Sequence, residues 1–190
     1  FDAESIEKCV RVFCNNDNAD CVLFRLVKVY PDDSEVEYTM NEHFPLDGKT
    51  AFERSIDWSI HGVYMTRSDI QKRIPYDDTC RSYSDDNTTR LHYLQSRKVF
   101  LSDGTYYYRQ NPASVSHIND ISRFNFLIAN EHMHMLLTEM HADERILSLH
   151  ENVRLNNLIG CYIFYCNNPY CTSKNTYTQA ACHLSNSPSD

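Results

Sequence analysis

Two histidines, His132 and His134, flank Met133 and form the most suggestive arrangement of side chains for chemistry in the sequence. On a β-strand, residues two positions apart share one face, so both imidazoles would point the same way. Such a pair can hold a metal ion when a third ligand, such as His141 or His150, lies close, and it can also supply an acid and a base. Because paired histidines are also typical of a solvent-facing strand, we predict no metal site and no cofactor. His132 and His134 are kept as acid and base candidates.

Three pairs of adjacent aspartates, Asp32-Asp33, Asp77-Asp78 and Asp85-Asp86, are the candidate catalytic carboxylates. Acid-base chemistry requires that burial or a neighbouring charge raise the pKa of one carboxyl group. All three pairs lie in stretches rich in turn-forming residues, where carboxylates are usually solvated. We therefore expect these aspartates to form turns.

Aromatic residues make up 12% of the chain, with 13 tyrosines, nine phenylalanines and one tryptophan. Many fall on strand-like segments, so one set of rings could line an apolar cavity with a few polar groups, as small-molecule sites do. A tyrosine-rich core is the alternative, because aromatic residues are ordinary sheet formers. The residues predicted to line a ligand cavity are Trp58, Tyr64, Tyr93, Phe100, Tyr106, Tyr108, Phe124 and Phe126.

Eight cysteines, an even number gathered mainly at the two ends, predict a disulfide framework in an oxidising compartment. Zinc binding is the alternative, but no pair has the short C-x2-C spacing of a zinc knuckle. Asn87 opens an acceptor sequence for N-glycosylation, which agrees with a secreted, extracellular protein. The cysteines expected in bridges, with their pairing left open, are Cys9, Cys14, Cys21, Cys80, Cys161, Cys166, Cys171 and Cys182.

The net charge and the hydropathy of the chain disfavour some classes of binding partner. Eighteen lysines and arginines against 26 aspartates and glutamates give a net charge of -8, which disfavours nucleic-acid binding. A mean hydropathy of -0.55 and short apolar runs argue against membrane insertion. The chain opens at Phe1 without a charged and apolar leader, so any secretion signal is expected to have been removed. We expect a small hydrophobic ligand as partner and leave the oligomeric state open.

Short strand-like segments that alternate with turns must position these residues. Asp103-Gly104 predicts a tight hairpin between two of them, since this dipeptide favours positive φ. A helical turn is expected at 68–73 and an amphipathic helix at 153–166. The ranges predicted as strands are 22–30, 35–43, 55–60, 63–66, 90–94, 98–101, 105–109, 123–129, 132–140 and 146–149.

One stretch of about 50 residues carries a family resemblance. It contains Ile56-Asp57-Trp58-Ser59-Ile60, then Gly62 and Tyr64-Met65-Thr66-Arg67-Ser68, followed by Leu91-His92-Tyr93 and Val99-Phe100-Leu101-Ser102. This succession resembles the lipocalin-like domain of violaxanthin de-epoxidases. A last strand followed by a helix, from Ile146 onward, is similar to the arrangement in the wider lipocalin and calycin superfamily. The resemblance implies a closed barrel of eight strands.

These patterns together predict an all-β, eight-stranded antiparallel lipocalin-like barrel with a C-terminal helix and disulfide-tied termini. A single domain over 1–190 would comprise a Cys-rich strap at 1–21, the barrel at 22–150, and a helix with a Cys-rich tail at 151–190. The predicted function is a secreted carrier that sequesters a small hydrophobic ligand inside the barrel. One alternative is an isomerase, oxidase or luciferase-type oxygenase on the same barrel. Another is a secreted protein-interaction module.

Overall fold

A single open sheet of four strands replaces the predicted barrel in the computed structural model, which describes residues 1–80, 82–111 and 121–168. The eight-stranded barrel is therefore wrong, and the fold is mixed α/β. The strands are β1 (Ala19–Val29), β2 (Glu35–Glu37), β3 (Tyr64–Thr66) and β4 (Lys98–Arg109). The helices are α1 (Ser5–Asn15), α2 (Gly48–Ile56), α3 (Ser68–Arg73), α4 (Ser84–Leu94), η2 (Ile121–Phe124), α5 (Asn125–Glu139) and α6 (Glu144–Asn167).

Strand β1 lies at the centre of the sheet. Strand β4 runs parallel to it along one edge, from the Ala19–Lys98 pair to the Val29–Arg109 pair. Strands β2 and β3 pair antiparallel with the two ends of β1 and so share its other edge. Since a parallel pair needs a long crossover, the chain between β1 and β4 contains α2, α3 and α4.

Both faces of β1 are buried, which explains its nearly continuous apolar sequence. Val22 and Phe24 pack with Cys9 of α1 on one face. Cys21 and Leu23 belong to a second cluster on the other face, together with residues of α2 and α4. Successive side chains of β1 point to opposite faces of the sheet and so belong to two separate hydrophobic cores.

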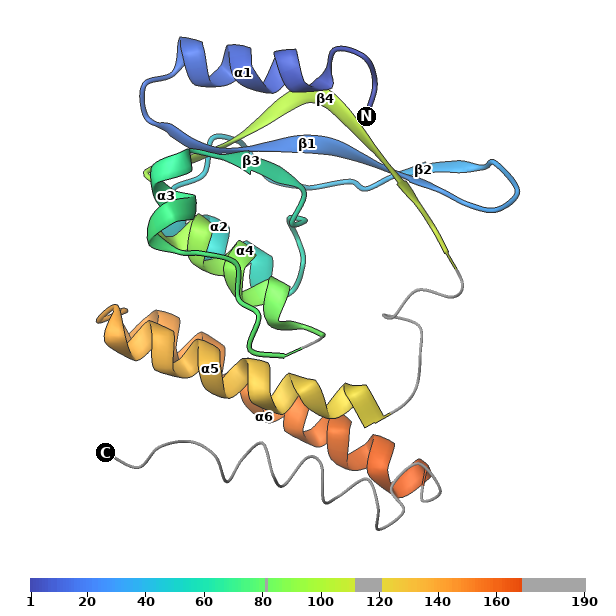
Figure 1. The fold of residues 1–190 in the computed structure, drawn as a ribbon, viewed down its shortest axis with the longest axis vertical. Coiled ribbons are helices and arrows are strands. Elements are labelled where there is room, and N and C mark those ends of the chain that lie inside the picture. Colours follow the sequence, from blue (N-terminus) through green and yellow to red (C-terminus); the bar gives the residue numbers. More distant parts are fainter. Residues whose placement is uncertain (81, 112–120, 169–190) are drawn as a thin grey trace.

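Figure 1 shows the resulting layers: α1, the sheet, α2 with α3 and α4, and then α5 with α6. A third core cluster joins the last two layers, where Phe52 and Leu91 meet Met133, Leu137 and Ile146. The long helices α5 and α6 form an antiparallel hairpin that packs on α2 and α4. No helix among the described residues has both the length and the apolar character that crossing a bilayer demands.

Five predictions of strands fail because the segments are helical or turn. The ranges 123–129 and 132–140 belong to η2 and α5, where Ala129, Met133 and Leu137 are buried at intervals of four residues. This spacing gives one helix face contact with the core. The range 90–94 lies in α4, 146–149 lies in α6, and 55–60 spans the end of α2 and the turn after it.

The predicted hairpin at Asp103-Gly104 is also wrong, because β4 continues through it as one strand. Gly104 does not have a positive φ. A Cβ added there would lie 2.6 Å from the backbone oxygen of Ser5 in α1. This glycine therefore allows the close approach of a helix, and it does not make a turn.

Other elements are confirmed. The strand predicted at 22–30 corresponds to β1, that at 63–66 to β3, and the helical turn at 68–73 to α3. The helix predicted at 153–166 lies within α6. Only the first residues of the strand predicted at 35–43 are in β2.

The disulfide framework is wrong for the cysteines that the structure describes. Cys9, Cys14, Cys21, Cys80, Cys161 and Cys166 are all free thiols. The buried ones serve as small core residues with local hydrogen bonds; the Cys9 sulfur, for example, lies 3.0 Å from Ser102 Oγ. Cys171 and Cys182 lie outside the described residues.

Candidate functional site

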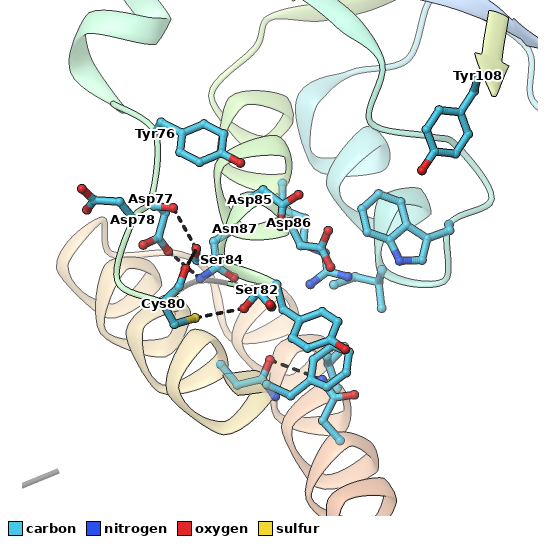
Figure 2. A pocket seen from close by; sticks show the side chains of 18 residues that line it. Tyr76, Asp77, Asp78, Cys80, Ser82, Ser84, Asp85, Asp86, Asn87 and Tyr108 are labelled. Atoms are coloured by element: carbon cyan, nitrogen blue, oxygen red, sulfur yellow. Dashed lines mark hydrogen bonds between the residues drawn. The ribbon is translucent and has the colours of Figure 1, made fainter. Parts of the chain in front are cut away.

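A pocket of about 850 Å³ opens where the loop before α4 and the first turn of α4 meet α5 and α6. We call it the Asp86 pocket; Figure 2 shows it from close by. The end of α2 and the end of β4 complete its walls. Its lining residues are Ile56, Trp58, Tyr76, Asp77, Asp78, Cys80, Ser82, Tyr83, Ser84, Asp85, Asp86, Asn87, Arg90, Tyr108, Phe126, Asn130, Val153 and Asn157.

Two aromatic residues of the wall have a left-handed backbone. Trp58 has a φ of 59° and Tyr83 a φ of 73°. Bulky residues adopt this conformation rarely, because Cβ crowds the following carbonyl group. Trp58 follows the C-cap of α2 and Tyr83 precedes α4, so each lies where the chain leaves or enters a helix. Strained backbone of this kind is concentrated at binding and catalytic sites.

Asp85 and Asp86 lie in the first turn of α4, where the helix dipole favours negative charge. Asp85 is exposed, whereas Asp86 is half-buried. Burial raises the pKa of Asp86 to about 6; Arg90 opposes this shift and the charge of Asp85 adds to it. A carboxyl group that titrates close to neutral pH can accept and release a proton, as a general base or acid must.

Asp77 is the second buried carboxylate of the pocket, and it is fully engaged. Its Oδ1 accepts hydrogen bonds from the backbone N–H and the hydroxyl of Thr79, at 3.0 and 2.7 Å. Its Oδ2 accepts from Asn87 Nδ2 at 2.8 Å and lies 3.0 Å from His132 Nδ1. Burial acts to raise the pKa of Asp77, but these hydrogen bonds outweigh it and lower the pKa. Asp77 thus stays ionised and connects the loop, α4 and α5.

Aromatic rings cover two sides of the pocket. The rings of Tyr83 and Phe126 stack with their centroids 3.5 Å apart. The guanidinium carbon of Arg90 lies 5.2 Å from the centre of the Trp58 ring, within the range of a cation–π contact. These contacts fix flat apolar surfaces against which a ligand can pack.

Two tyrosines face the carboxylates of α4. In Figure 2, Tyr76 and Tyr108 lie on opposite sides of Asp85 and Asp86, with their hydroxyl ends turned toward the pocket. Burial raises the pKa of Tyr76, and the charges of Asp85 and Asp86 raise it further. Both effects disfavour the ionised form of Tyr76, so its hydroxyl remains a hydrogen-bond donor.

Three lining residues carry buried polar atoms without a hydrogen-bond partner among the described residues. They are Ser82 Oγ, Arg90 Nε and Asn130 Nδ2. Buried polar groups in native proteins are nearly always satisfied, because leaving one unpaired costs about 1 to 3 kcal/mol. Three such atoms lie in the walls of this pocket, where water or a polar ligand can supply partners after small rotations of these side chains.

The pocket contains three of the eight aromatic residues predicted to line a cavity, namely Trp58, Tyr108 and Phe126. The other five lie elsewhere. Tyr64 and Tyr93 belong to the core between the sheet and α2 and α4, and Phe100 and Tyr106 pack in the cluster beside α1. Phe124 contacts Phe164 of α6.

His132 and His134 do not share a site, because on a helix residues two apart point in different directions. The imidazole of His132 contacts Asp77 and lines a second recess of about 520 Å³. His134 Nδ1 lies 2.8 Å from Glu151 Oε1 of α6. Neither histidine lines the Asp86 pocket.

Asn87, the predicted glycosylation site, is 1% exposed. Its Nδ2 donates to Asp77 Oδ2 and to the backbone oxygen of Ala129, each at 2.8 Å. The folded chain therefore does not present this nitrogen at its surface.

Sequence reasoning considered the aspartate pairs, expected them to form turns, and so left them out of the candidate site. Two of the three aspartate pairs, Asp77-Asp78 and Asp85-Asp86, line the same pocket. The available signal was their position eight residues apart, on either side of a short loop that enters a helix. Arg90 follows Asp86 by four residues and so lies on the same face of α4.

Comparisons with family models, with curated proteins and with solved structures find no match to this chain. None of them bears on the resemblance to the lipocalin-like domain, whose implied barrel differs from the open sheet described above.

Proposed function

We propose that this chain is an enzyme that binds an uncharged, hydroxyl-rich substrate, such as a sugar, in the Asp86 pocket, with Asp86 as general base. The observation that carries the proposal is the position of Asp86, a half-buried carboxylate on the wall of a pocket of about 850 Å³. Its pKa of about 6 suits it to take up a proton near neutral pH.

The chemistry of the walls supports a hydroxyl-rich substrate. The carboxylate oxygens of Asp78 and Asp85 can accept hydrogen bonds, and hydroxyl groups can donate them. The rings of Trp58 and Tyr83 offer apolar faces to the C–H groups of such a molecule. Arg90 is the one cationic side chain among the described lining residues, and it is buried. The four aspartates of the lining disfavour an anionic substrate, because like charges repel.

A wholly apolar ligand fits this pocket poorly. It would remove the carboxylates of Asp85 and Asp86 from water without offering them a hydrogen bond, which is costly. The predicted role as carrier of a hydrophobic molecule required the interior of a closed barrel. We therefore do not propose that role.

Asp86 would act on a hydroxyl group of the bound substrate. A carboxylate oxygen of Asp86 takes the proton, and the substrate oxygen keeps the electron pair and becomes a nucleophile. Arg90, whose positive charge lowers the pKa of Asp86 against the effect of burial, keeps part of the population ionised at neutral pH. Asp77 positions the loop and α4 and takes no proton.

Saturation-transfer NMR tests the substrate class. The probes are methyl hexosides, sugar phosphates and a fatty acid, each added to the full chain. We expect signal transfer to the uncharged hexosides, and a decrease of about tenfold or more in affinity in Trp58→Ala, since the ring supplies much of the contact. Tyr30→Ala is the control, because this exposed tyrosine lies outside the pocket.

A hexoside that binds is then incubated with the protein, and the rate of its conversion is measured. Asp86→Asn should bind it with similar affinity and lose about 10²- to 10⁴-fold in rate, the usual contribution of a general base. Binding of the fatty acid alone, or hexoside binding that Trp58→Ala leaves unchanged, would contradict the proposal.

A further inference from the structure

We propose that α5 and α6 together bind a divalent transition-metal ion such as Zn²⁺, with His134, His150 and Glu151 as its ligands. One ligand atom from each of these side chains lies within 4.8 Å of the others. None of the three residues lines the Asp86 pocket, so this site is separate from the proposed function.

The helix hairpin brings these residues together. His134 comes from α5, and His150 and Glu151 are neighbours on α6. The two imidazole rings are nearly parallel, with centroids 6.5 Å apart and planes at 21°. Ligand atoms of a tetrahedral zinc site lie about 3.3 Å apart, given metal–nitrogen bonds of about 2.0 Å. Side-chain rotations that close the widest gap by about 1.5 Å would complete this geometry.

His150 is the independent sign that a ligand belongs here. Its side chain is completely buried, and neither ring nitrogen has a hydrogen-bond partner among the described residues. A neutral imidazole has one donor and one acceptor, and both are normally satisfied in a protein interior. A metal ion bound to one nitrogen would satisfy the acceptor, which the side chains and backbone that the structure describes leave unpaired.

His134 and Glu151 are also poorly matched as a simple pair. Glu151 Oε1 lies 2.8 Å from His134 Nδ1, yet the angle excludes a hydrogen bond, and Nδ1 has no hydrogen-bond partner within the described part of the chain. Two electron-rich atoms that are close but not joined by a proton are the arrangement that a cation stabilises. The side chains of both residues remain partly exposed, at 36% and 49%, so an ion can enter from solvent.

The donor set selects the class of metal. Two imidazoles and one carboxylate suit Zn²⁺ and similar ions, whereas Mg²⁺ and Ca²⁺ prefer oxygen ligands throughout. Three protein ligands leave a fourth position for water. Arg154 Nη1 also contacts Glu151 Oε1, at 2.8 Å, but its other nitrogen pairs with Glu131. Glu151 can therefore turn to a metal ion without leaving Arg154 unpaired.

Equilibrium dialysis of the full chain against Zn²⁺, with metal measured by mass spectrometry, tests the proposal. We expect one zinc ion per chain that His134→Ala and His150→Leu each weaken by at least about tenfold. His150→Leu should fold well, because it replaces a buried, unpaired imidazole by an apolar group. Arg154→Gln should bind more tightly, because it removes a competing positive charge.

His141→Asn is the matched control. His141 directly follows the C-cap of α5, outside the ligand set, and asparagine tolerates its left-handed backbone. Cysteines are the competing ligands, so the Co²⁺ form is examined by absorption for thiolate charge transfer. The proposal is overturned if wild type binds no zinc, if His134→Ala and His150→Leu keep wild-type affinity, or if the Co²⁺ spectrum shows thiolate ligands.

Discussion

Asp77 and Asp86 line one pocket but experience opposite environments. Asp77 accepts hydrogen bonds from a backbone N–H and from two side chains, and these lower its pKa although it is buried. Asp86 has lost water without gaining such donors, so its pKa rises to about 6. Two carboxyl groups whose pKa values are pushed apart can divide positioning and proton transfer between them.

At the residue scale, this difference makes Asp86 a source of instability at high pH. Its folded-state pKa lies above the unfolded value of 3.8, so the folded state binds the proton more tightly and stability falls as pH rises through about 6. Asp86→Asn removes the charge. We expect it to be more stable than wild type at pH 8, by roughly 3 kcal/mol, and equally stable at pH 4. Urea unfolding at both pH values measures the difference.

Asp32→Asn is the control for this prediction. Asp32 is exposed, and hydrogen bonds from Ser34 lower its pKa, so its removal should give no gain in stability at pH 8. If Asp86→Asn were less stable than wild type at pH 8, the ionised form of Asp86 would be favourable in the folded state, and its role as base would lose its physical basis.

The site was only partly predictable from the sequence. Trp58, Tyr108 and Phe126 were expected to line a cavity because large aromatic residues form the walls of small-molecule sites. Asp86 could not be distinguished from Asp32 in the same way, because both belong to pairs of aspartates near turn residues. Burial separates them: Asp86 lies in a pocket that residues of α5 and α6 also line, and this tertiary arrangement cannot be read from the local sequence.

At the element scale, we expect substitution by alanine to have opposite effects on stability at two glycines. Gly48 begins α2, where a Cβ would lie 2.3 Å from the backbone oxygen of Ser96 and 2.5 Å from that of Tyr93. Gly160 lies within α6, and outside its own helix backbone no described atom lies within 4 Å of an added Cβ. We expect Gly48→Ala to destabilise the fold by about 1 to 3 kcal/mol and Gly160→Ala to stabilise it by about 0.5 to 1 kcal/mol. Thermal unfolding followed by circular dichroism ranks the two variants, and a neutral Gly48→Ala would show that α2 and α4 are not in close contact.

The elements that were predicted correctly are those with an unambiguous local signal. Strand β1 has β-branched and aromatic residues that end at Pro31, and α3 begins at Ser68 after an extended residue. The prediction of strands in the segment 123–140 was wrong because its apolar run is as compatible with a buried strand as with a helix. Its length and the interval of four between Ala129, Met133 and Leu137 favour the helix that the structure shows.

At the scale of the whole molecule, the described part of the fold is held by packing, and none of its cysteines is bridged. Cys14 and Cys166 are exposed, while Cys9 and Cys21 are buried. Burial raises the pKa of Cys21 to about 11, which leaves little thiolate to react. Iodoacetamide should therefore label Cys14 and Cys166 in the native chain and spare Cys9 and Cys21 until urea is added, as read by peptide mass mapping.

The alkylation experiment can also contradict the prediction of free thiols. If Cys14 or Cys166 resisted alkylation until a reductant was added, these cysteines would be oxidised in solution. Unfolding midpoints that are unchanged by reductant would agree with free thiols throughout the described residues.

The parallel pairing of β1 with β4 also governs the order in which the molecule can form. The Ser102 hydroxyl and the Leu23 backbone oxygen are joined by a hydrogen bond across 79 positions of sequence. The contact between Asn130 and Asn157, in the α5–α6 hairpin, spans only 27. Long-range pairs close slowly, because the entropy of the intervening loop must be lost before contacts compensate for it. The α5–α6 hairpin can therefore close faster than the pairing of β1 with β4, and during synthesis β1 has one unpaired edge until β4 has emerged.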